Sequence, residues 1–159
     1  MAREGEATHG FVGIHHRTLD VKGRLVLPVE LREALEEGGF ITRGPDNCLV
    51  LFKQEDFDSM ADDLAEKAKR GPAARKAVSA FYHGAARCQP DRQGRIAIPE
   101  HLRSFARLGE QVVVGGVESR IEVWDAEEWA RQDAEGQALL AQEQIYGQFP
   151  DDKVHDIGI

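Results

Sequence analysis

The feature that most constrains this chain of 159 residues is an internal repeat. The stretch "LDVKGRLVLP", from Leu19 to Pro28, returns as "PDRQGRIAIP", from Pro90 to Pro99. Six identities recur 71 positions apart: Asp20/Asp91, Gly23/Gly94, Arg24/Arg95, Pro28/Pro99, Leu31/Leu102 and Arg32/Arg103. A further match, "LVLFKQEDF" with "IEVWDAEEW", follows at a separation of 72. The chain therefore consists of two related halves and is not a long repeat array.

Each half predicts the same order of elements: a short strand, a polar turn ending in glycine, a second strand ending at proline, a short helix and two more strands. The expected strands are residues 13–18, 24–28, 40–42 and 48–52 in the first half, and 85–89, 95–99, 111–115 and 120–124 in the second. The short helices place one apolar stripe inward, formed by Leu31 and Leu35 in one copy and by Leu102, Phe105 and Leu108 in the other.

Two further helical regions lie outside the repeated parts. Met60, Leu64 and Ala68 have helical spacing, and Gly71-Pro72 ends that helix before a second one at residues 73–81. We expect this spacer to pack its apolar stripe on a sheet. Residues 126–146 predict an amphipathic C-terminal helix, followed by a frayed tail.

Composition excludes several classes of protein. No apolar run approaches the roughly 20 residues of a membrane span, and the first ten residues lack the apolar core of a secretory signal. Cys48 and Cys88 are the only cysteines and are far apart in sequence, which argues against a disulfide framework or a zinc site. We therefore expect a cytoplasmic protein with no metal and no cofactor.

The net charge of −8 argues against nucleic acid, but the charge is unevenly distributed. Each copy of the repeated motif lies in a small basic island with three cations and one carboxylate. The islands are Arg17, Lys22 and Arg24 with Asp20, and Arg87, Arg92 and Arg95 with Asp91. Acidic residues gather elsewhere, at 30–37, 55–66 and 125–135. A local basic surface is therefore compatible with the acidic total.

The repeated Asp-x-x-Gly-Arg pattern has two interpretations. Asp accepts backbone N–H bonds in turns, and Gly permits a positive φ, so the motif could be a turn held by an Asp–Arg pair. An exposed pair contributes only about 0–1 kcal/mol, which is a weak reason to keep both residues in two diverged halves. A loop tip with two cations is also suited to binding an anion. The two roles are compatible, and the residues alone leave both open.

The two motifs, the helical spacer between them and the strands "LVLF" and "IEVW" resemble the MraZ family, bacterial transcriptional regulators with two tandem SpoVT-AbrB domains. The resemblance covers about residues 11–129. It implies a β-rich α+β fold in which two AbrB-like swapped-hairpin halves form one pseudo-symmetric barrel. The implied limits are 14–56 and 83–128 for the two domains, 57–82 for the helical spacer, and 129–159 for the C-terminal helix and tail.

The resemblance also implies a function and partners. Family members form closed rings and bind G-rich direct repeats in the promoter of the division and cell wall gene cluster, which includes their own gene, and they usually repress it. The implied partners are double-stranded DNA and further copies of the chain, with no membrane and no small-molecule substrate. The implied location is the cytoplasm and nucleoid.

The motif arginines are the family's DNA-binding residues, which here are Arg24 and Arg95. Arginine offers a bidentate fork to guanine O6 and N7. The residues expected to hold phosphates are Lys22, Arg92, Arg17 and Arg87. The residues expected to shape the loops are Asp20, Gly23, Asp91 and Gly94.

Two alternatives come from other classes. An enzyme is disfavoured because the chain has no GxSxG, HExxH or P-loop motif, and the adjacent His15 and His16 would point to opposite faces of a strand. An AbrB-like oligomeric protein-interaction module without specific DNA binding is the second alternative. A module of this kind would still bind its protein partner after substitution of Arg24 and Arg95.

Overall fold

The computed structural model describes residues 10–142. The first repeat contains β1 (Ile14–Thr18), β2 (Arg24–Val26), α2 (Val29–Ala34), β3 (Gly39–Arg43), the 3-10 turn η1 (Pro45–Asn47) and β4 (Leu49–Lys53). The second contains β5 (Ala86–Cys88), β6 (Arg95–Ala97), α5 (Glu100–Phe105), β7 (Gln111–Val117) and β8 (Arg120–Asp125). Helices α3 (Gln54–Ala68) and α4 (Pro72–Gly84) separate the repeats, and α6 (Ala126–Gln142) follows the second. The expected helical residues 143–146 and the tail lie outside the described part.

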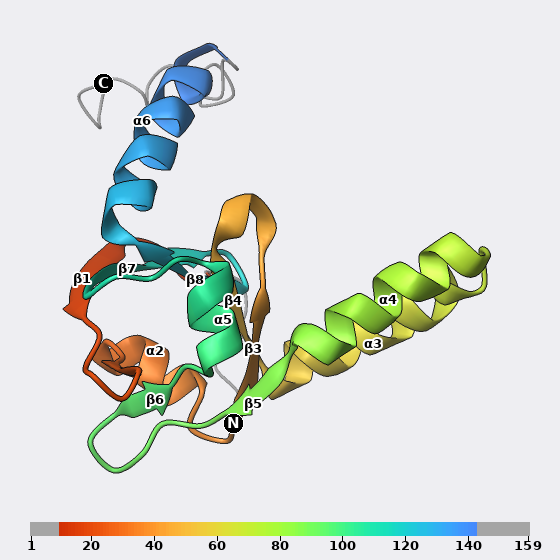
Figure 1. The fold of residues 1–159 in the computed structure, drawn as a ribbon. Coiled ribbons are helices and arrows are strands. Elements are labelled where there is room, and N and C mark those ends of the chain that lie inside the picture. Colours follow the sequence, from red (N-terminus) through yellow and green to blue (C-terminus); the bar gives the residue numbers. More distant parts are fainter. Residues whose placement is uncertain (1–9, 143–159) are drawn as a thin grey trace, which may run out of the picture. The chain divides into compact units, whose positions relative to one another are not determined.

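The strands form two sheets (Figure 1). The larger sheet is antiparallel, with the order β1-β7-β8-β4-β3-β5, and the smaller one pairs β2 with β6. The α+β class is therefore confirmed. Residues 10–142 contain no closed sheet, so the pseudo-symmetric barrel stays a prediction.

Most strand pairings join one repeat to the other. Strand β1 pairs with β7, β4 with β8, β3 with β5, and β2 with β6, whereas only β3–β4 and β7–β8 pair within a repeat. Within the described residues, 10–126 accordingly form one compact unit and 127–142 a second one. Because the two repeats supply each other's strand partners, they fold as one body.

The core is built from the apolar positions of the repeated sequence. In β2 and β6 the inward residues Leu25 and Ile96 are almost fully buried, and the next inward positions, Leu27 and Ile98, are buried as well. The predicted helix stripes are confirmed: the fully buried members are Leu31, Leu35 and Leu102, and Phe105 and Leu108 are partly buried against the same cluster. This core fixes the bases of the loops that precede β2 and β6.

The spacer differs in part from the prediction. Helices α3 and α4 pack against each other as a hairpin, and only its base contacts β3 and β4 (Figure 1). At that base, the buried ring of Phe57 stacks on Phe40 with centroids 3.8 Å apart. The stripe residues Met60 and Leu64 are only half-buried. In a hairpin of antiparallel helices, the apolar stripe of each helix packs on the other helix. Most of the α3 stripe is therefore covered by α4 and not by the sheet.

None of the described helices is both long and apolar enough to cross a bilayer.

Replacing Phe57 with alanine should detach the base of the hairpin, because it removes a buried ring that stacks on Phe40. We expect the free energy of unfolding to fall by about 3–5 kcal/mol in urea denaturation. Val21→Ala, at a fully exposed side chain, is the control and should change it by less than about 0.5 kcal/mol. Equal effects of the two substitutions would contradict this role of Phe57.

Candidate nucleic-acid interface

The first loop, between β1 and β2, is closed by Asp20. Its Oδ1 accepts hydrogen bonds from the backbone N–H groups of Lys22 (2.9 Å) and Arg24 (2.8 Å). Its Oδ2 accepts one from Nε of Arg24 at 2.8 Å. The Gly23 N–H donates to the Asp20 carbonyl at 2.9 Å, so side chain and backbone close the same turn. The motif therefore builds one specific loop and fixes its arginine.

The second loop, between β5 and β6, repeats these bonds. Oδ1 of Asp91 accepts from the backbone N–H groups of Gln93 and Arg95, both at 2.9 Å, and Oδ2 accepts from Nε of Arg95 at 2.9 Å. Gly94 and its counterpart Gly23 both have φ of +79°, a conformation that glycine adopts without steric cost. The loop-shaping role of the two aspartates and two glycines stays a prediction, which this geometry supports.

The hydrogen bonds of the loops alter the acidity of their aspartates. The backbone N–H of Arg24 lowers the pKa of Asp20 most; desolvation opposes this, and the Arg24 side chain lowers the pKa further. The pKa of Asp91 is lowered in the same way, first by the backbone N–H of Arg95. Both carboxylates are therefore charged at neutral pH and hold their arginines as ion pairs.

Each Asp–Arg pair leaves most of its guanidinium unused. The side chains of Arg24 and Arg95 are 33% and 28% exposed, and each pairs through Nε. A guanidinium has five N–H donors, so the four on Nη1 and Nη2 stay available on the edge that suits bidentate recognition. Within residues 10–142 no hydrogen bond occupies these four donors. The pairing of each arginine with aspartate is thus compatible with binding.

The other predicted cations fall into two groups. Lys22 and Arg92 are exposed at the loop tips, next to the paired arginines. Arg17 instead donates to the carbonyls of Val26 and His16, at 3.1 and 2.9 Å. Arg87 lies over the ring of Phe40, 5.1 Å from its centroid. The structure therefore brings Lys22 and Arg92 to the loop tips, whereas Arg17 and Arg87 make protein contacts on strands.

The two loops are joined at their bases. Beyond the β2–β6 pairing, the Ile98 N–H donates to the carbonyl of Gly23, and the Leu27 N–H donates to that of Gly94, both at 2.9 Å. Sequence reasoning missed Arg32 and Arg103, whose guanidinium groups lie against these glycines. The only sequence signal for a role of these two arginines was that Arg32 and Arg103 form one of the six identities between the repeats.

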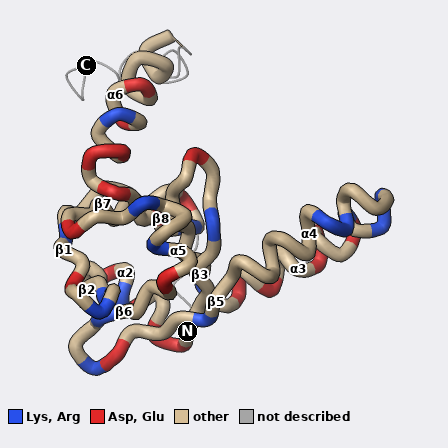
Figure 2. Tube along the Cα trace, viewed as in Figure 1, with Lys and Arg blue, Asp and Glu red and all other residues tan. Residues whose placement is uncertain are grey.

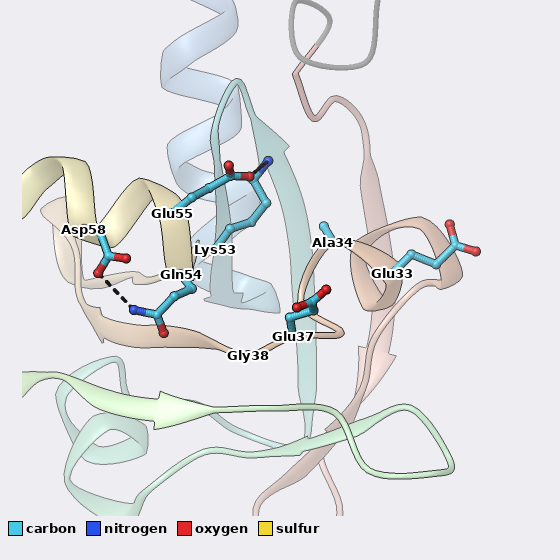
Figure 3. Close-up of a pocket in the computed structure, with 8 residues that line it drawn as sticks. All are labelled: Glu33, Ala34, Glu37, Gly38, Lys53, Gln54, Glu55 and Asp58. Carbon is cyan, nitrogen blue, oxygen red and sulfur yellow. Dashed lines mark hydrogen bonds and ion pairs between the residues drawn. The ribbon is translucent and has the colours of Figure 1, made fainter. Parts of the chain in front are cut away.

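A pocket elsewhere on the described chain is less suited to nucleic acid. A pocket of about 460 Å³ between α2 and the start of α3 is lined by the carboxylates Glu33, Glu37, Glu55 and Asp58 (Figure 3). Lys53, the one cation of its lining, pairs with Glu55 at 3.3 Å. This pocket would repel phosphate. Figure 2 shows a further cluster of cations at the tip of the α3–α4 hairpin.

Two buried thiols lie among the described residues. Burial raises the pKa of Cys48 to about 12 and that of Cys88 to about 11, so both thiols are protonated and weakly nucleophilic at neutral pH. No cluster of three metal-ligating side chains occurs between residues 10 and 142.

Acid should weaken the two loops. The folded-state pKa values of Asp20 and Asp91 lie below the ordinary 3.8, so the charged carboxylates stabilise the fold above that pH. This contribution is lost as the pH falls through the lowered values. A variant with both Asp20→Asn and Asp91→Asn should be less stable than the native chain at pH 7, and the difference should shrink below about pH 4.

Urea unfolding at several pH values measures this difference. Asp62→Asn, at an exposed carboxylate of α3, is the control and should keep the native pH dependence. A stability difference that does not change with pH would show that the charges of the two aspartates do not matter.

Comparison with known proteins places the chain in a family. The family model described as "MraZ protein, putative antitoxin-like" matches residues 11–79 and again 81–144. A protein named "Transcriptional regulator MraZ" from Moorella thermoacetica is 39% identical over 138 residues, covering 85% of this chain and 96% of that protein. Its namesake from Desulforamulus reducens is 38% identical over 132 residues, covering 83% and 93%. The chain belongs to the MraZ family.

Proposed function

We propose that this chain is a sequence-specific DNA-binding transcriptional regulator whose two loops present Arg24 and Arg95 to the bases. The observation that carries this proposal is the pairing of each arginine through Nε alone, which holds the side chain while leaving four N–H donors. An arginine that is already held loses less conformational entropy when it binds. The name "Transcriptional regulator" of the relatives supports the same function.

Base recognition and phosphate binding are assigned to different side chains. The paired arginines make bidentate contacts with guanine O6 and N7 in the major groove. The exposed Lys22 and Arg92 contact the adjacent phosphates, which orients the protein without reading sequence. Arg17 and Arg87 supply a weaker contribution to the basic surface, since their guanidinium groups also serve protein contacts.

Affinity in this proposal comes from assembly. One chain offers two loops on an acidic protein of net charge −8, so its own attraction for DNA is weak. A closed ring of copies would repeat the loops and engage promoter direct repeats at several points at once, which raises the overall affinity. In each copy the domains 14–56 and 83–128 would form the pseudo-symmetric barrel, and the spacer 57–82 and the segment 129–159 would belong to neither domain.

The family resemblance supports a proposal for the regulated genes. We propose that the protein acts in the cytoplasm, on the nucleoid, and represses the division and cell wall gene cluster that includes its own gene. No metal, cofactor or small-molecule substrate enters this mechanism.

Arg24→Ala and Arg95→Ala should each reduce affinity for the promoter of the chain's own gene by about tenfold or more, because each removes a bidentate base contact. Titration of labelled promoter DNA measures this, with assembly size and unfolding free energy checked for each variant. Arg70→Ala, at an exposed cation of the hairpin tip, is the control. Undiminished binding by folded, assembled variants would favour the protein-interaction module.

Lys22→Ala and Arg92→Ala should act differently, because they remove cations that bind phosphate. We expect affinity to fall equally for promoter and unrelated DNA, and the slope of log affinity against log salt to drop by about one for each cation removed. Salt titrations with both DNAs measure this. A loss confined to the promoter would assign these two side chains to base recognition instead.

A further inference from the structure

Arg32 in α2 and Arg103 in α5 each contact the loop of the opposite repeat. A Cβ built on Gly23 would overlap Nη1 of Arg103, so this guanidinium fills the space beside the Gly23 Cα. A Cβ built on Gly94 would overlap Cζ of Arg32 in the same way. Each arginine therefore lies where a larger loop residue would place its side chain.

Hydrogen bonds hold both arginines in these places. Nη1 of Arg103 donates to the Ile98 carbonyl at 2.6 Å, and the N–H of the same Ile98 donates to Gly23 at 2.9 Å. In the other direction Nη2 of Arg32 donates to the Leu27 carbonyl at 3.2 Å, and the Leu27 N–H donates to Gly94. One residue directly after β6 or β2, Ile98 or Leu27, thus connects each helix arginine to the loop of the other repeat.

We propose that Arg103 positions the Arg24 loop and that Arg32 positions the Arg95 loop, as a reciprocal brace that makes the two loops one DNA-reading unit. This inference rests on the proposed function. Gly23 directly precedes Arg24 and has φ of +79°, so a shift of this glycine redirects the arginine that follows it. Without the guanidinium of Arg103, the Gly23 backbone loses its packing partner, and the loop that carries the Asp20–Arg24 pair loses its fixed direction.

The geometry favours positioning over direct contact with DNA. Both helix arginines are half-buried and donate to internal carbonyls, and Nε of Arg32 is buried with no hydrogen-bond partner among the described residues. A side chain that serves a phosphate would direct its donors toward solvent. The brace also crosses between repeats. It therefore predicts that each helix arginine is coupled to the loop arginine of the other repeat, a pattern that neither direct DNA contact nor general loss of stability produces.

The test is a set of double-mutant cycles on promoter DNA with Arg103→Met and Arg32→Met, which keep a long side chain and remove the guanidinium. Arg103→Met should lower affinity about tenfold and leave the salt slope unchanged. It should have little further effect in an Arg24→Ala chain and its full effect in an Arg95→Ala chain. Arg32→Met should show the opposite pattern. Arg107→Met, at an exposed arginine after α5, is the control.

A second readout needs no DNA. In Arg103→Met, amide hydrogen exchange should become faster at Arg24 and stay unchanged at Arg95, with the reverse in Arg32→Met. Coupling of each helix arginine to the loop arginine of its own repeat would overturn the brace. So would an equal loss of promoter affinity in the Arg24→Ala and Arg95→Ala chains together with a salt slope lower by about one. If the native chain binds the promoter no better than unrelated DNA, the proposed function fails, while the exchange pattern still decides whether the brace exists.

Discussion

The pairing of β2 with β6 is the constraint on which the rest of the structure depends. Each strand has only three residues, and each pairs with its counterpart from the other repeat. The backbone bonds from Ile98 to Gly23 and from Leu27 to Gly94 extend this pairing to the loop bases. Neither loop therefore has a complete framework within its own repeat, and the duplication of the sequence follows from this requirement.

The two interpretations of the Asp-x-x-Gly-Arg motif, a turn held by an Asp–Arg pair and a loop that binds an anion, are served by the same arrangement of side chains. The carboxylate of Asp20 accepts three hydrogen bonds, and two of them come from Arg24, one from its backbone N–H and one from its Nε. A short carboxylate thus forms the turn and aligns the guanidinium in the same step. The pair adds little stability at an exposed site, but it can reduce the entropic cost of presenting a fixed arginine to a ligand.

Local patterns predicted the elements better than their partners. Strand, helix and turn positions followed from alternating apolar residues, prolines and glycines. Strand β2 ends at Val26 rather than Pro28, although the Leu27 N–H continues the register by donating to the Gly94 carbonyl. Alternation does not specify that β1 pairs with β7 of the other half. Arg32 and Arg103 stood out in the sequence only as repeated identities. Their role depends on contacts between the repeats, which local patterns do not predict.

Base recognition by the two guanidinium groups is tested by the ratio of promoter to unrelated-DNA affinity in a chain with Arg24→Lys and Arg95→Lys. Lysine keeps the positive charge but lacks the planar fork that binds guanine while pairing with aspartate. We expect affinity for unrelated DNA to be kept while the ratio falls close to one, with folding and assembly unchanged. An unchanged ratio would contradict this expectation, because base recognition would then not depend on the two guanidinium groups.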